Sequence, residues 1–182
     1  MSDFKRDLKR GAYYETKSIN ILLKHGFKKI KIDYKYNPYY DLKAYENRKR
    51  VYIEVKYNSL TDKTNKIFLE CCKFDKTNKI LASGISITKA TYYIFYSYTK
   101  YYMCNTQDVK RLLERTIRDT LKKSNINNPT YEQLRAYIEH NGLRTQNTIG
   151  ILISVDDVIN ICKYNGIHLH NTKNIYTRNL FK

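Results

Sequence analysis

Two neighbouring stretches in the first third of the chain alternate between apolar and polar residues. A period of two is typical of β-strands that bury one face, because successive side chains point to opposite sides of a strand. A polar turn at 46–49 separates the two stretches, so the sequence predicts a β-hairpin with one face in the core. The apolar face of this hairpin comprises Leu42, Ala44, Val51, Ile53 and Val55.

The opposite face of the hairpin brings charges of both signs together. Glu54 and Lys56 are two residues apart in the second strand, and Asp41 lies on the same face of the first strand. Carboxylate oxygens on rigid strands are the hard ligands that Mg²⁺ prefers. Beside them the Lys56 ammonium is expected to stay charged, which favours a role in stabilising a charged transition state over that of a neutral base. The pattern therefore predicts a divalent-metal site at Asp41 and Glu54, with Lys56 next to it.

An amphipathic helix is predicted ahead of the hairpin, over residues 3–25, and Gly26 ends it. Glu15 falls within its apolar stripe, where a carboxylate is costly unless a positive group meets it. Two interpretations of Glu15 stay open: an ion pair with a lysine at the helix edge, or a position over the sheet as part of the metal site. The stripe itself comprises Phe4, Leu8, Ala12, Ile19, Leu22 and Leu23.

A loop rich in small residues is predicted to follow a strand at 66–72. Its Ser83, Thr88 and Lys89 supply two hydroxyl donors and one cation. Such a loop suits a phosphate held by hydroxyls and backbone N–H groups, and it equally suits an ordinary connection. Glu70, near the end of the preceding strand, is either a further group of the metal site or a surface residue.

Helical patterns dominate after residue 105. Helices are predicted at 107–123 and at 131–140, and the second opens with a Thr-x-x-Gln capping box. A strand at 148–154 and a helix at 155–164 follow. The outer side of the first of these helices is either a surface for phosphate backbones or a solvated face. Its basic residues are Lys110, Arg111, Arg115 and Arg118.

The net charge and the cysteine content limit which kinds of partner and which cellular compartments fit this chain. The chain of 182 residues has 34 Lys and Arg against 17 Asp and Glu, a net charge of +17 that points to a polyanionic partner. Its 19 tyrosines can stack on bases as well as pack in strands. The four cysteines form no Cys-x-x-Cys motif, which argues against a zinc cage or a disulfide framework. We expect a reducing intracellular compartment, cytoplasm or nucleus, with no signal peptide and no membrane span.

The spacing of these residues resembles that of the PD-(D/E)xK nuclease superfamily, which includes restriction enzymes, archaeal Holliday-junction resolvases and RecB-like nucleases. Asp41, preceded by Tyr40, stands where the family has Pro-Asp, and Glu54 and Lys56 match its Glu-x-Lys strand. Glu15 resembles the first-helix glutamate of the resolvase-like and RecB-like branches. Tyr40 in place of proline is a departure from the family pattern. The resemblance covers about the first hundred residues and assigns nothing to those that follow.

This resemblance implies an α/β (α+β) fold with a restriction-endonuclease-like core at 1–105, in which helices flank a central mixed sheet. Residues 106–182 would form a mostly helical extension packed on the same domain. The implied activity is that of a Mg²⁺-dependent deoxyribonuclease, an endonuclease of the junction-resolving or restriction-like kind, and Mn²⁺ could replace Mg²⁺. The implied partner is DNA, and a homodimer is compatible with the family. The implied catalytic residues are Glu15, Asp41, Glu54 and Lys56.

Other interpretations stay open at this point. The acidic cluster could be structural, which would make the protein a non-catalytic, basic nucleic-acid-binding module. It could also be a member of the same superfamily that cuts RNA, or an interaction protein whose basic surface meets an acidic partner. A bias toward Lys, Asn, Ile and Tyr is typical of an AT-rich genome, such as that of a virus or phage.

Overall fold

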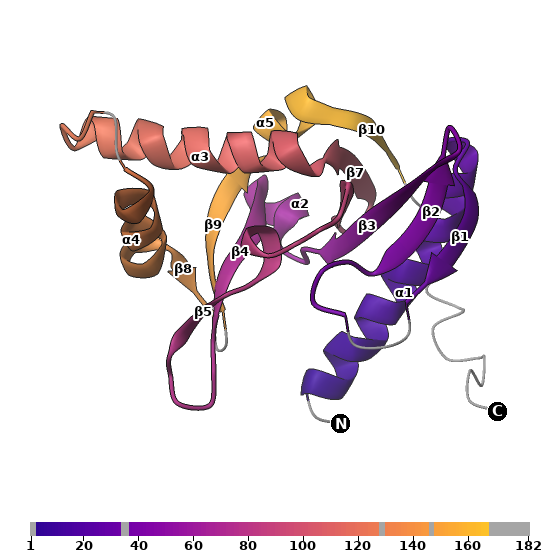
Figure 1. The fold of residues 1–182 in the computed structure, drawn as a ribbon, viewed down its shortest axis with the longest axis horizontal. Helices are drawn as coiled ribbons and strands as arrows, with labels where there is room; N and C mark the ends of the chain where they lie inside the picture. Colours follow the sequence, from indigo (N-terminus) through magenta and orange to yellow (C-terminus); the bar gives the residue numbers. More distant parts are fainter. Residues whose placement is uncertain (1–2, 34–36, 128–129, 146–147, 168–182) are drawn as a thin grey trace.

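The structure, a computed structural model, describes residues 3–33, 37–127, 130–145 and 148–167. Within these residues the chain has a mixed α/β fold, with two sheets and five α-helices (Figure 1). The predicted α/β class with a mixed central sheet is therefore confirmed. In the described part of the chain, no helix is long and apolar enough to cross a membrane.

The larger sheet, sheet A, carries the predicted hairpin. In spatial order its strands are β1 (Lys28–Ile32), β2 (Leu42–Glu46), β3 (Lys49–Tyr57), β6 (Tyr92–Tyr96), β7 (Lys100–Asn105) and β10 (Cys162–Ile167). Adjacent strands are antiparallel except β3 and β6, which are parallel. The hairpin is formed by β2 and β3, with Leu42 opposite Ile53. Its turn is shorter than predicted: Asn47 and Arg48 both have positive φ, as a two-residue type I′ turn requires.

Helix α1 (Asp3–Lys24) covers one face of sheet A, and the predicted stripe matches its buried face only in part. Leu22 is buried and Ile19 is half-buried against the core, as predicted, whereas Ala12 is exposed; the side chain of Phe4 lies outside the described part. Leu8 and Leu23 are 65% and 56% exposed. The buried face includes a tyrosine and a serine, which an apolar pattern counts as polar. The Ser18 hydroxyl donates to the Tyr14 carbonyl (2.8 Å) and is hydrogen-bonded to the Tyr96 hydroxyl (3.0 Å), so its burial costs little. The buried residues of α1 are Tyr14, Ser18, Ile21 and Leu22.

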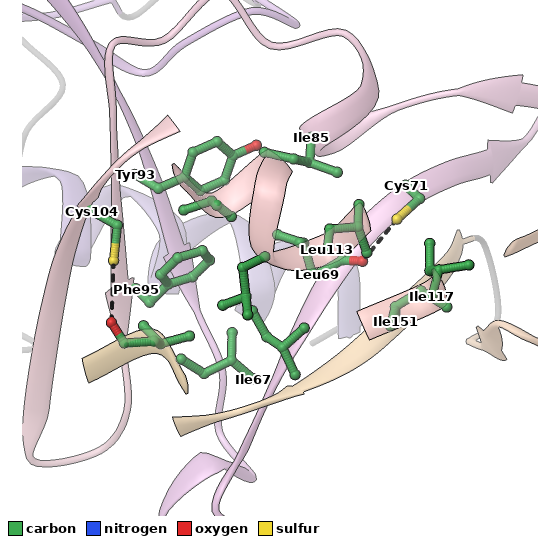
Figure 2. Packing of buried hydrophobic residues seen from close by; sticks show 14 of the residues in the cluster. Ile67, Leu69, Cys71, Ile85, Tyr93, Phe95, Cys104, Leu113, Ile117 and Ile151 are labelled. Atoms are coloured by element: carbon green, nitrogen blue, oxygen red, sulfur yellow. Dashed lines mark hydrogen bonds between the residues drawn. The ribbon is translucent and has the colours of Figure 1, made fainter. Parts of the chain in front are cut away.

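Sheet B lies against the other face of β6 and β7. Its strands, all antiparallel, are in spatial order β5 (Ile80–Ala82), β4 (Lys66–Phe74), β9 (Thr148–Ser154) and β8 (Leu143–Arg144). Phe95 and Tyr102 of sheet A share one buried cluster with Ile67 and Leu69 of sheet B (Figure 2). Helix α3 (Thr106–Lys123) closes this cluster with Val109, Leu112, Leu113, Ile117 and Leu121.

The connection from β3 to β6 differs from the pattern of the resembling family. That pattern has a helix, three antiparallel strands, a second helix and a further strand. Here the connection consists of the single-turn helix α2 (Thr61–Thr64), strands β4 and β5, and the 3₁₀ turn η1 (Gly84–Ser86). The order of elements agrees with the family in α1, in β1–β3 and in the further strand β6. It differs in the connection from β3 to β6, where strands β4 and β5 of sheet B take the place of the second helix.

Residues after Asn105 contribute to both sheets. The predicted helices are present as α3 and α4 (Tyr131–Asn141), and the capping box of α4 is formed as predicted. The side chain of Asn105 caps α3, one residue earlier than expected. The predicted strand is β9, which pairs with β4, while α5 (Val155–Ile161) ends early and leads into β10 beside β7. This region is thus part of both sheets as well as helical; residues 168–182 lie outside the described part.

A glycine fixes the position of η1 against β4. Gly84 has a φ of +50°, and a Cβ built on it would lie 2.4 Å from the backbone oxygen of Glu70. Gly26, after α1, also has a positive φ, of +82°, but a Cβ there would meet nothing within 4 Å. A substitution at either glycine carries the energetic cost of a left-handed backbone, whereas only a substitution at Gly84 adds a steric clash. Comparing the two positions therefore distinguishes these two costs.

We expect Gly84→Ala to lower the free energy of unfolding far more than Gly26→Ala. The left-handed backbone alone costs about 1–2 kcal/mol for a residue with a Cβ. Overpacking against Glu70 adds about 1–3 kcal/mol at Gly84. Urea denaturation of the two variants measures the difference. Equal losses of stability would show that η1 does not lie tightly against β4.

Candidate active site

The hairpin places Asp41 directly beside the middle of β3. The Asp41 backbone N–H donates to the Ile53 carbonyl (2.9 Å), and the Asp41 carboxylate accepts from the Val55 N–H (2.7 Å). The side chain of Asp41 thus continues the hydrogen-bond ladder where β2 begins. This bond fixes the carboxylate next to β3, the strand that carries Glu54.

Glu54 and Lys56 form a close ion pair on the face of sheet A opposite α1. The Lys56 Nζ lies 2.8 Å from a Glu54 carboxylate oxygen, and the two side chains are 35% and 8% exposed. Burial lowers the pKa of Lys56, but Glu54, Glu70 and Asp41 together outweigh it, so that the net shift is upward. Lys56 is therefore a fixed cation at neutral pH, as the sequence predicts.

The two carboxyls of the predicted metal site both have raised pKa values. Burial is the main cause for Glu54; Asp41 and Glu70 raise its pKa further, and Lys56 opposes them. Burial also raises the pKa of Asp41 most, against Lys56 and the Val55 N–H, and Glu15 adds to the rise. The pKa of each carboxyl is thus raised in part by negative charge nearby, and Lys56 neutralises that charge only partly. Such a site gains from binding either a proton or a cation.

Glu15 lies within electrostatic reach of this cluster. It is half-buried on α1, and its pKa is raised by burial and by Glu54 and lowered by Lys56. The structure therefore brings Asp41, Glu54 and Lys56 together, while Glu15 acts on them from α1 through its charge and makes no direct contact with them that the described residues show.

Glu70 approaches the same cluster from sheet B. Its charge acts on both Glu54 and Lys56, and its carboxylate accepts a hydrogen bond from the Ser83 hydroxyl. A pocket of about 130 Å³ separates Glu70 from Lys56. Its lining consists of Lys56, Tyr57, Asn58, Phe68, Leu69, Glu70 and Tyr93. A larger cavity of about 440 Å³, between α3, α4 and β5, contains none of these carboxylates.

Tyr93 is a candidate site residue that the sequence did not single out. It is 1% exposed, and its hydroxyl has no hydrogen-bond partner in the described chain. Figure 2 shows the hydroxyl at the edge of the core, pointing toward Ile85 of η1. Burial raises the Tyr93 pKa and Glu54 raises it further, while the Thr88 hydroxyl lowers it from nearby; that hydroxyl donates to the Tyr39 carbonyl and forms no hydrogen bond of good geometry with Tyr93. The sequence gives no sign that Tyr93 belongs to the site, because it is one of several tyrosines in a strand. Its hydroxyl is enclosed by elements that are distant in the sequence.

The predicted phosphate-binding residues fall into two groups. Ser83 and Thr88 are buried next to the site, and their hydroxyls donate within the protein, Ser83 to Glu70 and Thr88 to the Tyr39 carbonyl (2.9 Å). Lys89 is exposed, with its Nζ 4.3 Å from the centre of the Tyr39 ring. None of the predicted basic residues of α3 lines the pocket beside Lys56. Three of them form surface ion pairs: Arg111 with Asp108 (3.0 Å), Arg115 with Asp157 (3.4 Å) and Arg118 with Glu114 (2.7 Å).

The donor set beside Lys56 suits a hard cation in chemistry and number. Asp41 and Glu54 offer carboxylate oxygens, and Mg²⁺ commonly binds through one or two carboxylates and keeps several waters. In the described residues, no three His, Cys, Asp or Glu side chains gather closely enough to hold a metal ion by themselves. Two carboxylates, from Asp41 and Glu54, are thus the residues that would hold such an ion.

Comparisons of the chain with models of known protein families, with curated protein sequences and with solved structures found no significant match.

The raised carboxyl pKa values predict a pH dependence of stability. A raised folded-state pKa means that the protonated form stabilises the fold at low pH, and this contribution is lost as pH rises through the folded pKa. In EDTA we expect the free energy of unfolding to fall from pH 5 to pH 8, by on the order of 2 kcal/mol per carboxyl. Glu54→Gln should show a smaller fall in urea denaturation. Asp119→Asn, which alters an exposed carboxylate on α3, should follow the wild type.

Tyr93→Phe is expected to stabilise the protein. The substitution removes a buried hydroxyl without a partner, a group that costs about 1–3 kcal/mol. We expect the free energy of unfolding to rise by about 1 kcal/mol in urea denaturation. Thr106→Val provides a matched control, since the Thr106 hydroxyl is also buried and unpartnered but lies at the start of α3. Loss of stability in Tyr93→Phe alone would show that its hydroxyl is bonded in solution.

Proposed function

We propose that the protein is a Mg²⁺-dependent nuclease that hydrolyses DNA phosphodiester bonds as an endonuclease. The observation that carries this proposal is the convergence of Asp41, Glu54 and Lys56 on one face of sheet A, two acids with raised pKa values beside one fixed cation. Phosphodiester hydrolysis needs a nucleophilic water, neutralisation of phosphate charge and help for the leaving oxygen. A divalent ion bound by the two carboxylates supplies the first two.

The chain's own residues have distinct roles in this proposal. Asp41 and Glu54 would hold the ion, and the bond from the Val55 N–H keeps Asp41 in the orientation that this requires. Lys56 would donate to a phosphoryl oxygen as negative charge develops there, because its ammonium remains protonated. Its ion pair with Glu54 prevents it from serving as a neutral base. Glu15, half-buried at the same site, would orient a water bound to the ion.

The fold and the charge of the chain also support the proposal. The helix α1, the three antiparallel strands β1–β3 and the further strand β6 are among the elements expected of a restriction-endonuclease-like core, although β4 and β5 stand where that core has a second helix. The net charge of +17 favours a nucleic acid as substrate, through the release of counterions from the phosphate backbone. Junction-resolving and restriction-like activities would differ in how two copies of the chain pair, and a homodimer is part of this proposal.

Single substitutions at the site should abolish cleavage without abolishing binding. We expect Asp41→Ala, Glu54→Ala and Lys56→Ala each to reduce the rate of plasmid nicking by about 10²–10⁴, equivalent to several kcal/mol of lost transition-state stabilisation. Asp119→Ala, on the exposed side of α3, should cut like the wild type. Nicking of supercoiled plasmid with Mg²⁺, with Mn²⁺ and with EDTA measures these rates.

The same assay separates the alternatives. Wild-type protein that binds DNA with no cleavage in Mg²⁺ or Mn²⁺ would be a nucleic-acid-binding module, and the acidic cluster would then be structural. Cleavage of RNA alone would assign the enzyme to RNA. A variant at position 41, 54 or 56 that kept its rate within about tenfold would remove that residue from the mechanism.

A further inference from the structure

Within the described residues, sheet B reaches the outer face of the hairpin only at Glu54 and Lys56, and the part around Tyr45 and Tyr52 carries no further layer. α1 covers one face of β2 and β3, and the residues of sheet A that pack against sheet B are Tyr93, Phe95, Tyr102 and Cys104, all from β6 and β7. In Figure 1 the hairpin lies on the side of the molecule away from sheet B and α4. The outer face around Tyr45 and Tyr52 is therefore available to a partner.

This face combines tyrosine rings with basic side chains in a fixed register. Lys43 lies opposite Tyr52, and Tyr45 lies opposite Arg50, so all four share the face that carries Glu54. The rings are half-buried, while Arg50 is exposed and the Lys43 side chain is 42% exposed. We call the set Tyr40, Tyr45, Tyr52, Lys29, Lys43 and Arg50 the tyrosine face.

Contacts within the tyrosine face hold its rings in place. The Tyr40 and Tyr52 rings lie 4.5 Å apart, and the Lys43 Nζ lies 5.3 Å from the centre of the Tyr40 ring. Tyr45 lies between two cations, with the Lys29 Nζ at 5.6 Å and the Arg50 guanidinium at 5.8 Å from its ring centre. A tyrosine that is already ordered loses little side-chain entropy when a ligand stacks on it.

The tyrosine face runs directly into the candidate active site. Tyr40 precedes Asp41 in the chain, and Tyr52 is two residues from Glu54 on the same side of β3. At about 3.3 Å per strand residue, a group stacked on Tyr52 lies roughly 7 Å from Glu54 along the strand. A nucleotide next to a phosphate held at the carboxylates would therefore reach the rings.

We propose that the tyrosine face binds the unpaired bases of a single-stranded nucleic acid next to the bond that is cut. Aromatic rings that stack bases, together with cations that follow the backbone, are how proteins bind single strands without regard to sequence. A duplex keeps its bases stacked inside and offers this face only phosphates. The inference names the substrate class of the proposed nuclease, and to that extent it rests on the proposed function.

Binding measured without cleavage tests this inference separately. In EDTA, fluorescence anisotropy compares a labelled dT oligonucleotide, a U-containing RNA of equal length and a blunt DNA hairpin. We expect Tyr52→Leu and Tyr40→Leu each to weaken binding of the dT oligonucleotide by roughly 5- to 150-fold, the range for one lost base stack, and to change hairpin binding less than about threefold. Tyr52→Phe keeps the ring and should bind like the wild type. The RNA arm shows whether the face also accepts ribose.

Two further variants control for surface and charge. Tyr98→Leu alters an exposed tyrosine, in the turn between β6 and β7, and should leave all three affinities unchanged. Lys43→Gln should reduce the salt dependence for the single strand and the hairpin alike, by about one unit of slope or less.

Two results would overturn the inference: equal losses for the single strand and the hairpin in Tyr52→Leu, or a matching loss in Tyr52→Phe. Either would show that the rings do not stack bases. Failure of the proposed function is seen in another assay, as an absence of cleavage of both the plasmid and the dT oligonucleotide in Mg²⁺ and Mn²⁺ while ring-dependent binding of the dT oligonucleotide persists. If the protein nicks plasmid but its binding of the dT oligonucleotide does not depend on the Tyr40 and Tyr52 rings, only the inference is overturned.

Discussion

The ion pair between Lys56 and Glu54 is the interaction on which the site depends. Glu54 is almost fully buried, and a carboxylate in that position without a partner would be strongly destabilising. One lysine compensates it only in part, because Asp41, Glu15 and Glu70 contribute further negative charge to the same region. The fold tolerates this excess since hydrogen bonds from Val55 and Ser83 hold two of the carboxylates. Perturbed carboxylates around one buried member are typical of functional sites.

The two sheets explain why the chemistry lies on β3. Every residue of β6 is buried, because α1 covers one face of this strand and sheet B covers the other. β3, next to it, has only its α1 side fully covered, and Tyr52, Glu54 and Lys56 occupy the side that sheet B just reaches. The pocket beside Lys56 lies at this boundary between dry core and open surface. Charges at such a boundary interact more strongly than charges in bulk water do.

Local signals in the sequence predicted the elements, and contacts between distant elements decided the rest. The hairpin, the helices α3 and α4 and the strand β9 follow from periodicity, caps and turn residues, all of which act within a few positions. The pairing of Leu69 with Ile151, which builds sheet B, has no such signal. Glu70 comes to the site with sheet B, and sheet B and η1 enclose the Tyr93 side chain of β6, so the sequence left the role of Glu70 undecided and gave no sign of a role for Tyr93. The partly misplaced stripe of α1 has a simpler cause: an apolar pattern counts Tyr14 and Ser18 as polar, although both are buried.

The distribution of charge across the chain fits these local features. A net charge of +17 attracts a polyanion from any direction, while the carboxylates form a small negative region that repels it. In the proposed nuclease a bound divalent ion would remove that repulsion where the scissile phosphate would lie, so binding of the metal and of the nucleic acid would reinforce each other. The cations of the tyrosine face would need no such help, because each of them already lies beside an aromatic ring. Attraction by the whole surface, stacking on the hairpin and neutralisation at Asp41 and Glu54 would thus be three separate contributions to binding, and only the last would depend on a metal.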